Sequence, residues 1–427
     1  MDDNKISVSI LPNEYLKRDF SSIQKELNGN DTDYEKIIDL SRKEGIFDLD
    51  KALDTCGKIG GVCYNKEGFD ALIDEPKEKT NRRIDMTINN GHHSIYDHIF
   101  ISFNMRNIPK ILAMVLNNEK QYTTSEKSAR YTRVASQSGS SISKEEQEAY
   151  DEWVNIFKEE ITKKYGDILP ENKITKLAME NARYLVTVFM PTTFIYTTSL
   201  RQINNIAAFM KRYIDEANYN DSFDVKLTSA MKEVLGELER LNVLDPRLMT
   251  NNKNRQFSLF GKDLENNREY FGKVYTTRYD ASFAELAQAQ RHRTLDYQME
   301  RYSDTNKKFY VPQIIRGVDK LDSKWRSDIS SLGNNYPQGE LVLVNEEGKY
   351  EDFILKAKER LCSAAQLEIC EQTRNTLERY RMNLMYSENP LKDDIEKYTH
   401  GARCTFPDYK CSEDCHFNEG KRLVRKI

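Results

Sequence analysis

The sequence predicts a mixed fold of strands and helices, built as two tandem copies of one domain. Ile99–Met105 alternates apolar and polar residues, as a half-buried strand does. The apolar run Ile108–Leu116 follows, with Pro109 near a plausible helix start. An offset of 173 residues places Val274–Arg278 over the strand and Ser282–Gln288 over the helix. A repeat at a fixed offset indicates duplication, with chance similarity of two strand–helix pairs as the alternative.

Bulk composition describes a globular enzyme with a polar surface. The 427 residues allow two or three domains, and 38% are hydrophobic against 31% charged. A net charge of −4 gives no basic field for nucleic acid, so any anionic ligand must be held by local arginines. No stretch approaches the ~20 apolar residues of a membrane span, and Met1–Lys5 does not resemble a signal peptide. We therefore expect a cytoplasmic protein with no membrane or nucleic-acid partner.

The chain organisation follows from pattern and composition. We expect five segments: an N-terminal extension (1–52), a first repeat (53–250), an Asn- and Lys-rich linker (251–268), a second repeat (269–385) and a tail (386–427). Helices are expected at 34–43, from 150, at 174–189 with a stop at Met190-Pro191, at 199–217 and at 225–241. The longest element is expected at 351–385.

Three of the six histidines stand in Gly91–His98. A zinc site here alone would be poor, because His92 and His93 cannot easily face one ion. Ser94 and Asp97 have the spacing of a capping box, which is the structural interpretation of this segment.

Two arginine motifs stand about 170 residues apart. The first is Ser128-x-Arg130-Tyr131, with Glu126 two residues before the serine. The second is Arg291-His292-Arg293, with Gln288 three residues before it. Guanidinium forks suit phosphate groups, although a basic helix end favoured by the helix dipole is the alternative for the second motif.

Together these segments resemble flavin-dependent thymidylate synthases, whose signature reads R-H-R-x-x-S-x-N-E-x-S-x-R-Y. The front end stands at 291–293 and the back end at 125–131, so each copy keeps a different part. Gly91–His98 is similar to the family's G-H-x-S-x-x-E-H, with Asp97 in place of glutamate. Arg360–Ile369 resembles its R-x-x-x-x-A-Q-x-E-I helix. The resemblance covers roughly residues 53–385.

The resemblance implies an α+β fold with an antiparallel sheet and helices in each copy. It implies FAD as cofactor, with NADPH and methylene-tetrahydrofolate as co-substrates, and reductive methylation of dUMP to dTMP. Family members are homotetramers with sites between subunits, so we expect a homodimer of this tandem chain that imitates the tetramer. The alternatives are another C5 modification of a pyrimidine nucleotide, such as hydroxymethylation, and a non-catalytic flavin or nucleotide binder.

The resemblance also assigns residues to roles. The expected catalytic group is Ser128, Arg291, His292 and Arg293. The expected nucleotide-binding group is Glu126, Ser128, Arg130, Gln288 and Arg360. The expected flavin contacts are His92, Ser94, Asp97, Asn204 and the Arg291-His292-Arg293 tripeptide. Because each copy lacks what the other retains, we expect Ser128 and Arg130 to share a site with Arg291 and Arg360.

Several positions depart from the family pattern. Met299 falls where a serine is expected, because the motif after Arg293 is two residues short. The arginine expected six residues after a proline is Thr197 in one copy and Leu343 in the other. The nearest remnant of an Asn-x-Arg flavin contact is Asn204-Asn205. These departures bear on substrate identity more than on fold.

The seven cysteines are too few and too scattered for a disulfide framework. Cys362 and Cys370 lie in a helical pattern and are expected to be small core residues. The tail residues Cys404, Cys411, Cys415 and His416 could hold a structural zinc ion, with unliganded thiols as the alternative.

Overall fold

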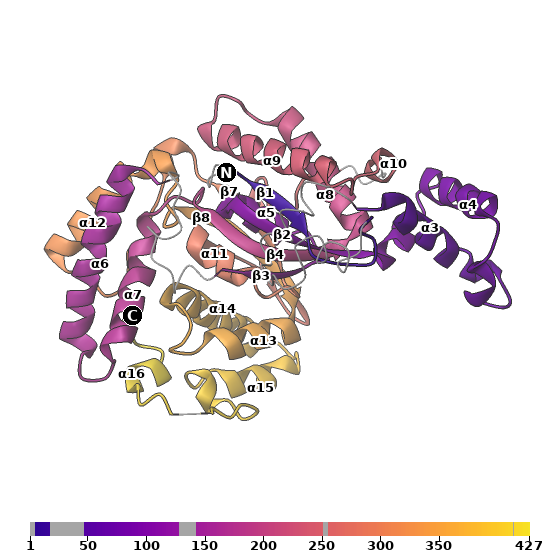
Figure 1. Cartoon of the computed structure of the whole chain (residues 1–427). Helices are drawn as coiled ribbons and strands as arrows, with labels where there is room; N and C mark the ends of the chain where they lie inside the picture. The colour runs from indigo at the N-terminus through magenta and orange to yellow at the C-terminus, as the bar shows by residue number, and fades with distance from the viewer. Residues whose placement is uncertain (1–4, 18–46, 128–141, 251–254, 413) are drawn as a thin grey trace, which may run out of the picture. The chain divides into compact units, whose positions relative to one another are not determined.

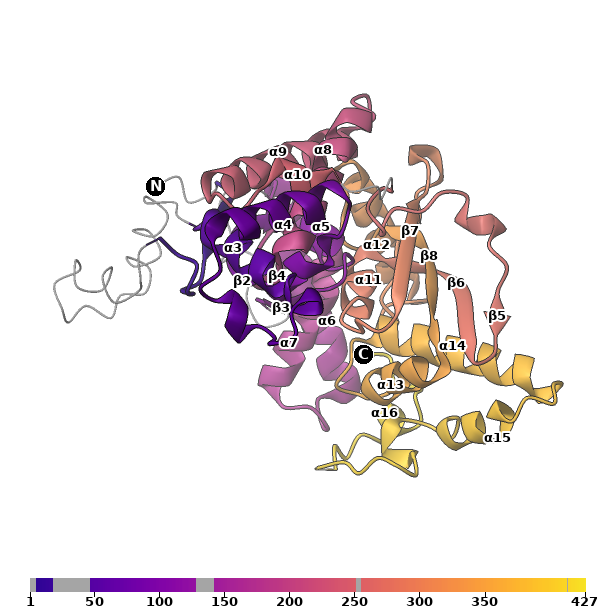
Figure 2. The same ribbon diagram turned by 90° about the vertical axis from the view of Figure 1, so that its right-hand side faces the viewer.

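The computed structural model describes residues 5–17, 47–127, 142–250, 255–412 and 414–427. The chain forms two compact units, each built from two stretches of sequence. The first unit comprises Met1–Lys127 and Pro191–Phe257, and the second comprises Ser128–Met190 and Ser258–Ile427. Figures 1 and 2 show the elements of both units along the chain.

The first unit is organised around a four-stranded antiparallel sheet in the order β1-β2-β4-β3. The strands are β1 (Ser7–Ile10), β2 (Phe100–Pro109), β3 (Thr123–Glu126) and β4 (Pro191–Ser199). Ile101, Phe103 and Met105 are fully buried at alternate positions of β2, so the alternation seen in the sequence selects the core face. The predicted strand at 99–105 is confirmed.

The helices of this unit pack against the sheet or against one another. They are α3 (Leu49–Ile59), α4 (Lys77–Asn89), α5 (Lys110–Leu116), α8 (Leu200–Glu216), α9 (Ser222–Arg240) and α10 (Pro246–Met249), with 3-10 turns η1 (Val62–Tyr64), η2 (Asp70–Leu72) and η3 (His93–His98). Ser199 ends β4 and caps α8, since its hydroxyl accepts from the backbone N–H of Gln202 at 3.1 Å. The strand β4 thus passes directly into α8, so the first residues of α8 lie at the end of the sheet where β4 stops.

The second unit repeats this topology. Its antiparallel sheet has the order β5-β6-β8-β7, from β5 (Tyr270–Phe271), β6 (Val274–Ser282), β7 (Asp296–Arg301) and β8 (Leu341–Lys349). The helix α11 (Phe283–Ala289) has seven residues, like α5, and begins 173 residues after it. Strand β8 has nine residues, like β4, and begins 150 residues after it. The internal duplication remains a prediction, which this shared topology supports.

The other helical elements of the second unit include both inserted and terminal segments. They are α6 (Lys144–Tyr165), α7 (Glu171–Ala182), α12 (Asp319–Ser331), α13 (Tyr350–Arg360), α14 (Leu367–Met385), α15 (Leu391–Ile395) and α16 (Asn418–Lys421), with 3-10 turns η5 (Arg183–Leu185), η6 (Leu264–Asn266), η7 (Asp304–Asn306), η8 (Gly333–Asn335), η9 (Glu396–Tyr398) and η10 (Arg403–Thr405).

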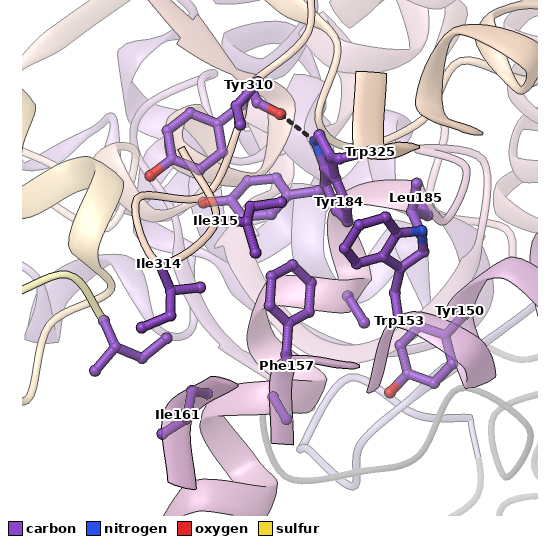
Figure 3. Close-up of a cluster of buried hydrophobic side chains, with 14 of the residues drawn as sticks. Tyr150, Trp153, Phe157, Ile161, Tyr184, Leu185, Tyr310, Ile314, Ile315 and Trp325 are labelled. Atoms are coloured by element: carbon purple, nitrogen blue, oxygen red, sulfur yellow. Dashed lines mark hydrogen bonds between the residues drawn. The ribbon is translucent and has the colours of Figure 1, made fainter. Parts of the chain in front are cut away.

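An aromatic cluster fixes α6 and α12 in the second unit (Figure 3). Trp153 and Trp325, the only two tryptophans of the chain, are fully buried with their rings edge to face at 4.9 Å. Phe157 meets Trp325 at 5.4 Å, and the Trp325 indole donates to the carbonyl of Tyr310 at 2.8 Å. Because aromatic burial of this kind dominates core energetics, residues 142–190 pack in the second unit although they precede β4.

Some expected element boundaries are wrong. The helix expected at 174–189 ends at Ala182, and the element expected at 351–385 is two helices, α13 and α14. The helix expected at 34–43 lies outside the described residues. The N-terminal extension supplies β1 to the first sheet, and the tail places Phe417 and Ile427 in the core of the second unit.

Candidate functional site

The Arg-His-Arg motif follows the short helix α11 in the second unit. Ser282 caps this helix, since its hydroxyl accepts from the backbone N–H of Glu285 at 3.0 Å. A turn then begins, in which the backbone N–H of His292 donates to the carbonyl of Ala289 at 2.9 Å. His292 is buried, whereas Arg291 and Arg293 on either side of it are exposed. The motif therefore presents two guanidiniums at the surface around a buried imidazole.

Arg360 at the end of α13 joins this motif. Its Nε donates to Nε2 of His292 at 2.7 Å, and its Nη2 donates to the carbonyl of Gln288 at 3.3 Å. Burial, with the charges of Arg360 and Lys356 nearby, lowers the pKa of His292 to about 2. The imidazole is therefore neutral, and it accepts the hydrogen bond without neutralising the guanidinium. The structure thus brings together Gln288, His292 and Arg360, three residues that the sequence assigned to one site.

In the first unit, a carboxylate stands at the position that corresponds to the neutral imidazole of His292. Because α5 precedes α11 by 173 residues, Glu119 corresponds to His292. The Glu119 carboxylate is buried and pairs with Arg255 at 2.8 Å. A carboxylate neutralises the guanidinium that it binds, whereas a neutral imidazole does not. The second unit is therefore the better candidate for an anion site of this kind.

The histidine segment of the first unit forms the 3-10 turn η3. His92 and Ser94 are exposed, whereas His93 is buried with its Nε2 at 3.0 Å from the carbonyl of Ile88. No side-chain cap is present at the start of this described turn, so the capping-box interpretation of Ser94 and Asp97 is wrong. Asp97 instead accepts from Ser199 and Arg201.

Arg201 is a candidate that the sequence reasoning missed. Its Nη1 donates to Asp97 at 2.7 Å, and its side chain is 23% exposed. Ser199-Leu200-Arg201 has the spacing of the Asn-x-Arg pattern with serine in the first place, and that substitution hid the match. Asn204, which we expected to contact flavin, is fully buried and hydrogen-bonds Leu200, Val243 and Asp245. The side-chain amide of Asn204 makes its hydrogen bonds within the fold. We therefore take Arg201 as the candidate flavin contact in its place.

The structure describes only part of residues 125–131, the back end of the signature. Ser128 and Arg130 lie outside the described residues. Glu126 ends β3 with a side chain only 2% exposed, and it accepts from Lys110 at 2.6 Å and from Thr192 at 2.9 Å. Glu126 therefore ties strands β3 and β4 to the start of α5, and its assignment to nucleotide binding remains a prediction.

The tail cysteines form a loose group. Cys404, Cys411 and Cys415 are exposed free thiols. Burial, and then the neighbouring Cys411 and Cys415, raise the pKa of Cys404, so the three thiols lie within electrostatic reach of one another. Within the described ranges, however, no set of three or more His, Cys, Asp or Glu side chains is arranged to hold a metal ion. The zinc site that includes His416 thus remains a hypothesis without structural support.

Residues 47–218 match the family model described as thymidylate synthase complementing protein. This part of the chain is similar to that family. The match includes α3 to α8 and therefore the His92 turn, Asp97 and Arg201, whereas residues 219–427 lie outside it. No curated protein matches the chain. Among the described helices of this thymidylate synthase relative, none has the length and apolar character needed to cross a membrane.

Proposed function

We propose that the chain is a flavin-dependent enzyme that methylates dUMP at C5, with methylene-tetrahydrofolate as carbon donor and NADPH as reductant. The observation that carries the proposal is the cluster of Gln288, His292 and Arg360 in the second unit. It joins two motifs that lie about 70 residues apart and that resemble the same family. The family match of residues 47–218 supports the thymidylate synthase class independently, since it involves the other copy.

Arg360 and Gln288 bind the nucleotide in this proposal. Arg360 donates to a neutral imidazole, which does not offset the positive charge that a phosphate or a pyrimidine carbonyl would meet. Arg291 and Arg293 are exposed beside it and supply further cationic groups. His292 has no acid–base role here, because its pKa of about 2 keeps it unprotonated at physiological pH. It orients Arg360.

His92, Ser94 and Arg201 hold the flavin in this proposal, and their donor chemistry fits FAD. Arg201 is 23% exposed and its bond to Asp97 fixes its direction, so it offers hydrogen-bond donors to the flavin, although Asp97 offsets its charge. His92 and Ser94 are exposed next to Asp97 on the same turn. FAD, when bound, supplies the hydride and one-carbon transfer chemistry, while the protein positions the nucleotide and excludes competing reactions.

A second candidate is a homologue that binds flavin and nucleotide without turnover. Met299 stands where the family has a serine, and it is buried in β7. That position therefore offers no hydroxyl to a ligand. Product formation separates the two candidates, whereas ligand binding alone does not.

Calorimetric titration of dUMP into the FAD-loaded chain tests the proposal. Arg360→Ala should weaken binding by about 1.5–3 kcal/mol, or roughly 10- to 100-fold, because a charge-assisted hydrogen bond is lost. Arg326→Ala is the matched control, since Arg326 is a surface arginine of the same unit paired with Asp322. Equal affinity of both variants and the wild type would show that Arg360 does not contact the nucleotide.

A further inference from the structure

A group of ionisable side chains is buried in the second unit beside the candidate site. The group consists of Glu285, Glu346, Glu368 and Lys356. The Lys356 ammonium pairs with Glu346 at 2.6 Å, and neither side chain is exposed. Tyr275 and Tyr279 also donate to Glu346, at 2.6 and 2.5 Å. Glu346 is therefore fully partnered, as a buried carboxylate must be.

Glu368 is also satisfied. It accepts from the backbone N–H of Ser282 at 2.9 Å, from the Ser282 hydroxyl at 2.6 Å and from the Tyr184 hydroxyl at 2.8 Å. Burial raises the pKa of Glu368 to about 7, against the opposing effect of these hydrogen bonds. Its contacts link the start of α11 to α14, which is a structural role.

Glu285 is different, because neither of its carboxyl oxygens has a hydrogen-bond partner within the described part of the chain. Its side chain is fully buried on α11. The corresponding residue of the first unit is Leu112, which is equally buried. Burying an unpartnered carboxyl costs free energy that leucine avoids, so packing does not explain Glu285. Unexplained buried ionisable groups mark candidate functional sites.

The surroundings of Glu285 connect it to Arg360. Glu285 precedes Gln288 by one helical turn of α11, and the carbonyl of Gln288 accepts from Arg360. The charged or titratable groups that face Glu285 are Lys356 and Arg360 from α13, Glu346 from β8, Glu368 from α14 and Tyr279 from β6. Burial raises the pKa of Glu285 to about 8, despite the opposing effect of Lys356. The carboxyl is therefore mostly protonated at neutral pH.

We infer that Glu285 is a positioning residue that acts through Arg360 to control how strongly the Gln288–His292–Arg360 cluster attracts an anionic ligand. With its proton, Glu285 is neutral and does not offset the charge of Arg360. Without its proton, Glu285 places a negative charge in a poorly screened interior, within electrostatic reach of Arg360, and partly offsets the charge of that arginine. The inference rests on the proposed function in taking the anion to be the pyrimidine nucleotide.

The test is the pH dependence of dUMP binding to the FAD-loaded chain between pH 7 and 9. In the wild type, affinity should fall by about tenfold across this range as Glu285 ionises. Glu285→Gln, which is isosteric and cannot ionise, should bind with nearly constant affinity. Glu285→Leu places at this position the residue found at Leu112, and it should also bind dUMP with nearly constant affinity. This variant controls for any effect of the glutamine amide. An equal loss of affinity in the wild type and both variants would overturn the inference.

Infrared spectroscopy provides a readout that needs no ligand. The wild type minus Glu285→Gln difference spectrum at pH 7 should contain the C=O band of a protonated carboxyl, and this band should disappear at pH 9. If the wild type binds no dUMP at either pH, the proposed function fails. The infrared band still shows whether Glu285 is protonated in the folded chain. Absence of this band at pH 7 would overturn the inference by itself.

Discussion

Replacing Glu285 with leucine should stabilise the second unit, and the gain should grow with pH. Burial raises the pKa of Glu285 from 4.5 to about 8. The folded chain therefore keeps a proton that the unfolded chain releases, and stability is lost as pH rises from 4.5 through 8. At about 1.4 kcal/mol per pKa unit, the wild type should lose about 3 kcal/mol by pH 7 and up to about 5 kcal/mol by pH 9. Glu285→Leu should lack this loss.

Tryptophan fluorescence during urea unfolding measures this effect in the correct unit. Both tryptophans of the chain, Trp153 and Trp325, lie in the core of the second unit, so their emission reports on that unit alone. The control is Glu378→Leu, which removes a half-exposed carboxylate near Arg381 and should change stability by less than about 1 kcal/mol at every pH. A Glu285→Leu gain that is the same at pH 5 and pH 9 would refute the reasoning.

The remaining assignments each have a direct test. His292→Glu should weaken dUMP binding at least about tenfold with FAD retained, because a carboxylate would neutralise Arg360 as Glu119 neutralises Arg255; unchanged affinity would contradict this. Arg201→Ala should weaken FAD binding about tenfold or more in an absorbance titration, whereas full retention would make Arg201 structural. A zinc site in the tail predicts about one zinc per chain by elemental analysis, and folded zinc-free protein would leave ordinary thiols there.

Local patterns in the sequence predicted the elements whose two faces differ. The strand at 99–105 alternates because one face of β2 is buried, and the helix that follows begins where Pro109 leaves the strand. The pattern failed at 183–189, where Arg183–Leu185 form a 3-10 turn and the residues after it pair with residues 336–338 instead of continuing the helix. There Val186 accepts from the backbone of Gln338 at 2.7 Å, and Val188 donates to Tyr336 at 2.8 Å. Residues 184–188 are all buried, and this removes the period that distinguishes a helix from a strand.

Part of the candidate site was predicted for a different reason. Arg291-His292-Arg293 and Arg360 were predicted because their motifs resemble those of flavin-dependent thymidylate synthases, and the structure joins His292 to Arg360. Arg201 was missed because a serine replaces the asparagine of its pattern. Glu285 was missed because a charged residue in a short apolar helix looks like a surface position. Its one sequence signal is Leu112 at the equivalent place of the first copy.

Product analysis shows directly whether the chain forms dTMP. The purified chain is incubated with dUMP, methylene-tetrahydrofolate, NADPH and FAD, and the nucleotide product is identified by mass. We expect dTMP, formed only when FAD is present and lost in Arg360→Ala but not in Arg326→Ala. A chain that retains FAD and dUMP yet forms no modified nucleotide would contradict the claim that it is a thymidylate-forming enzyme.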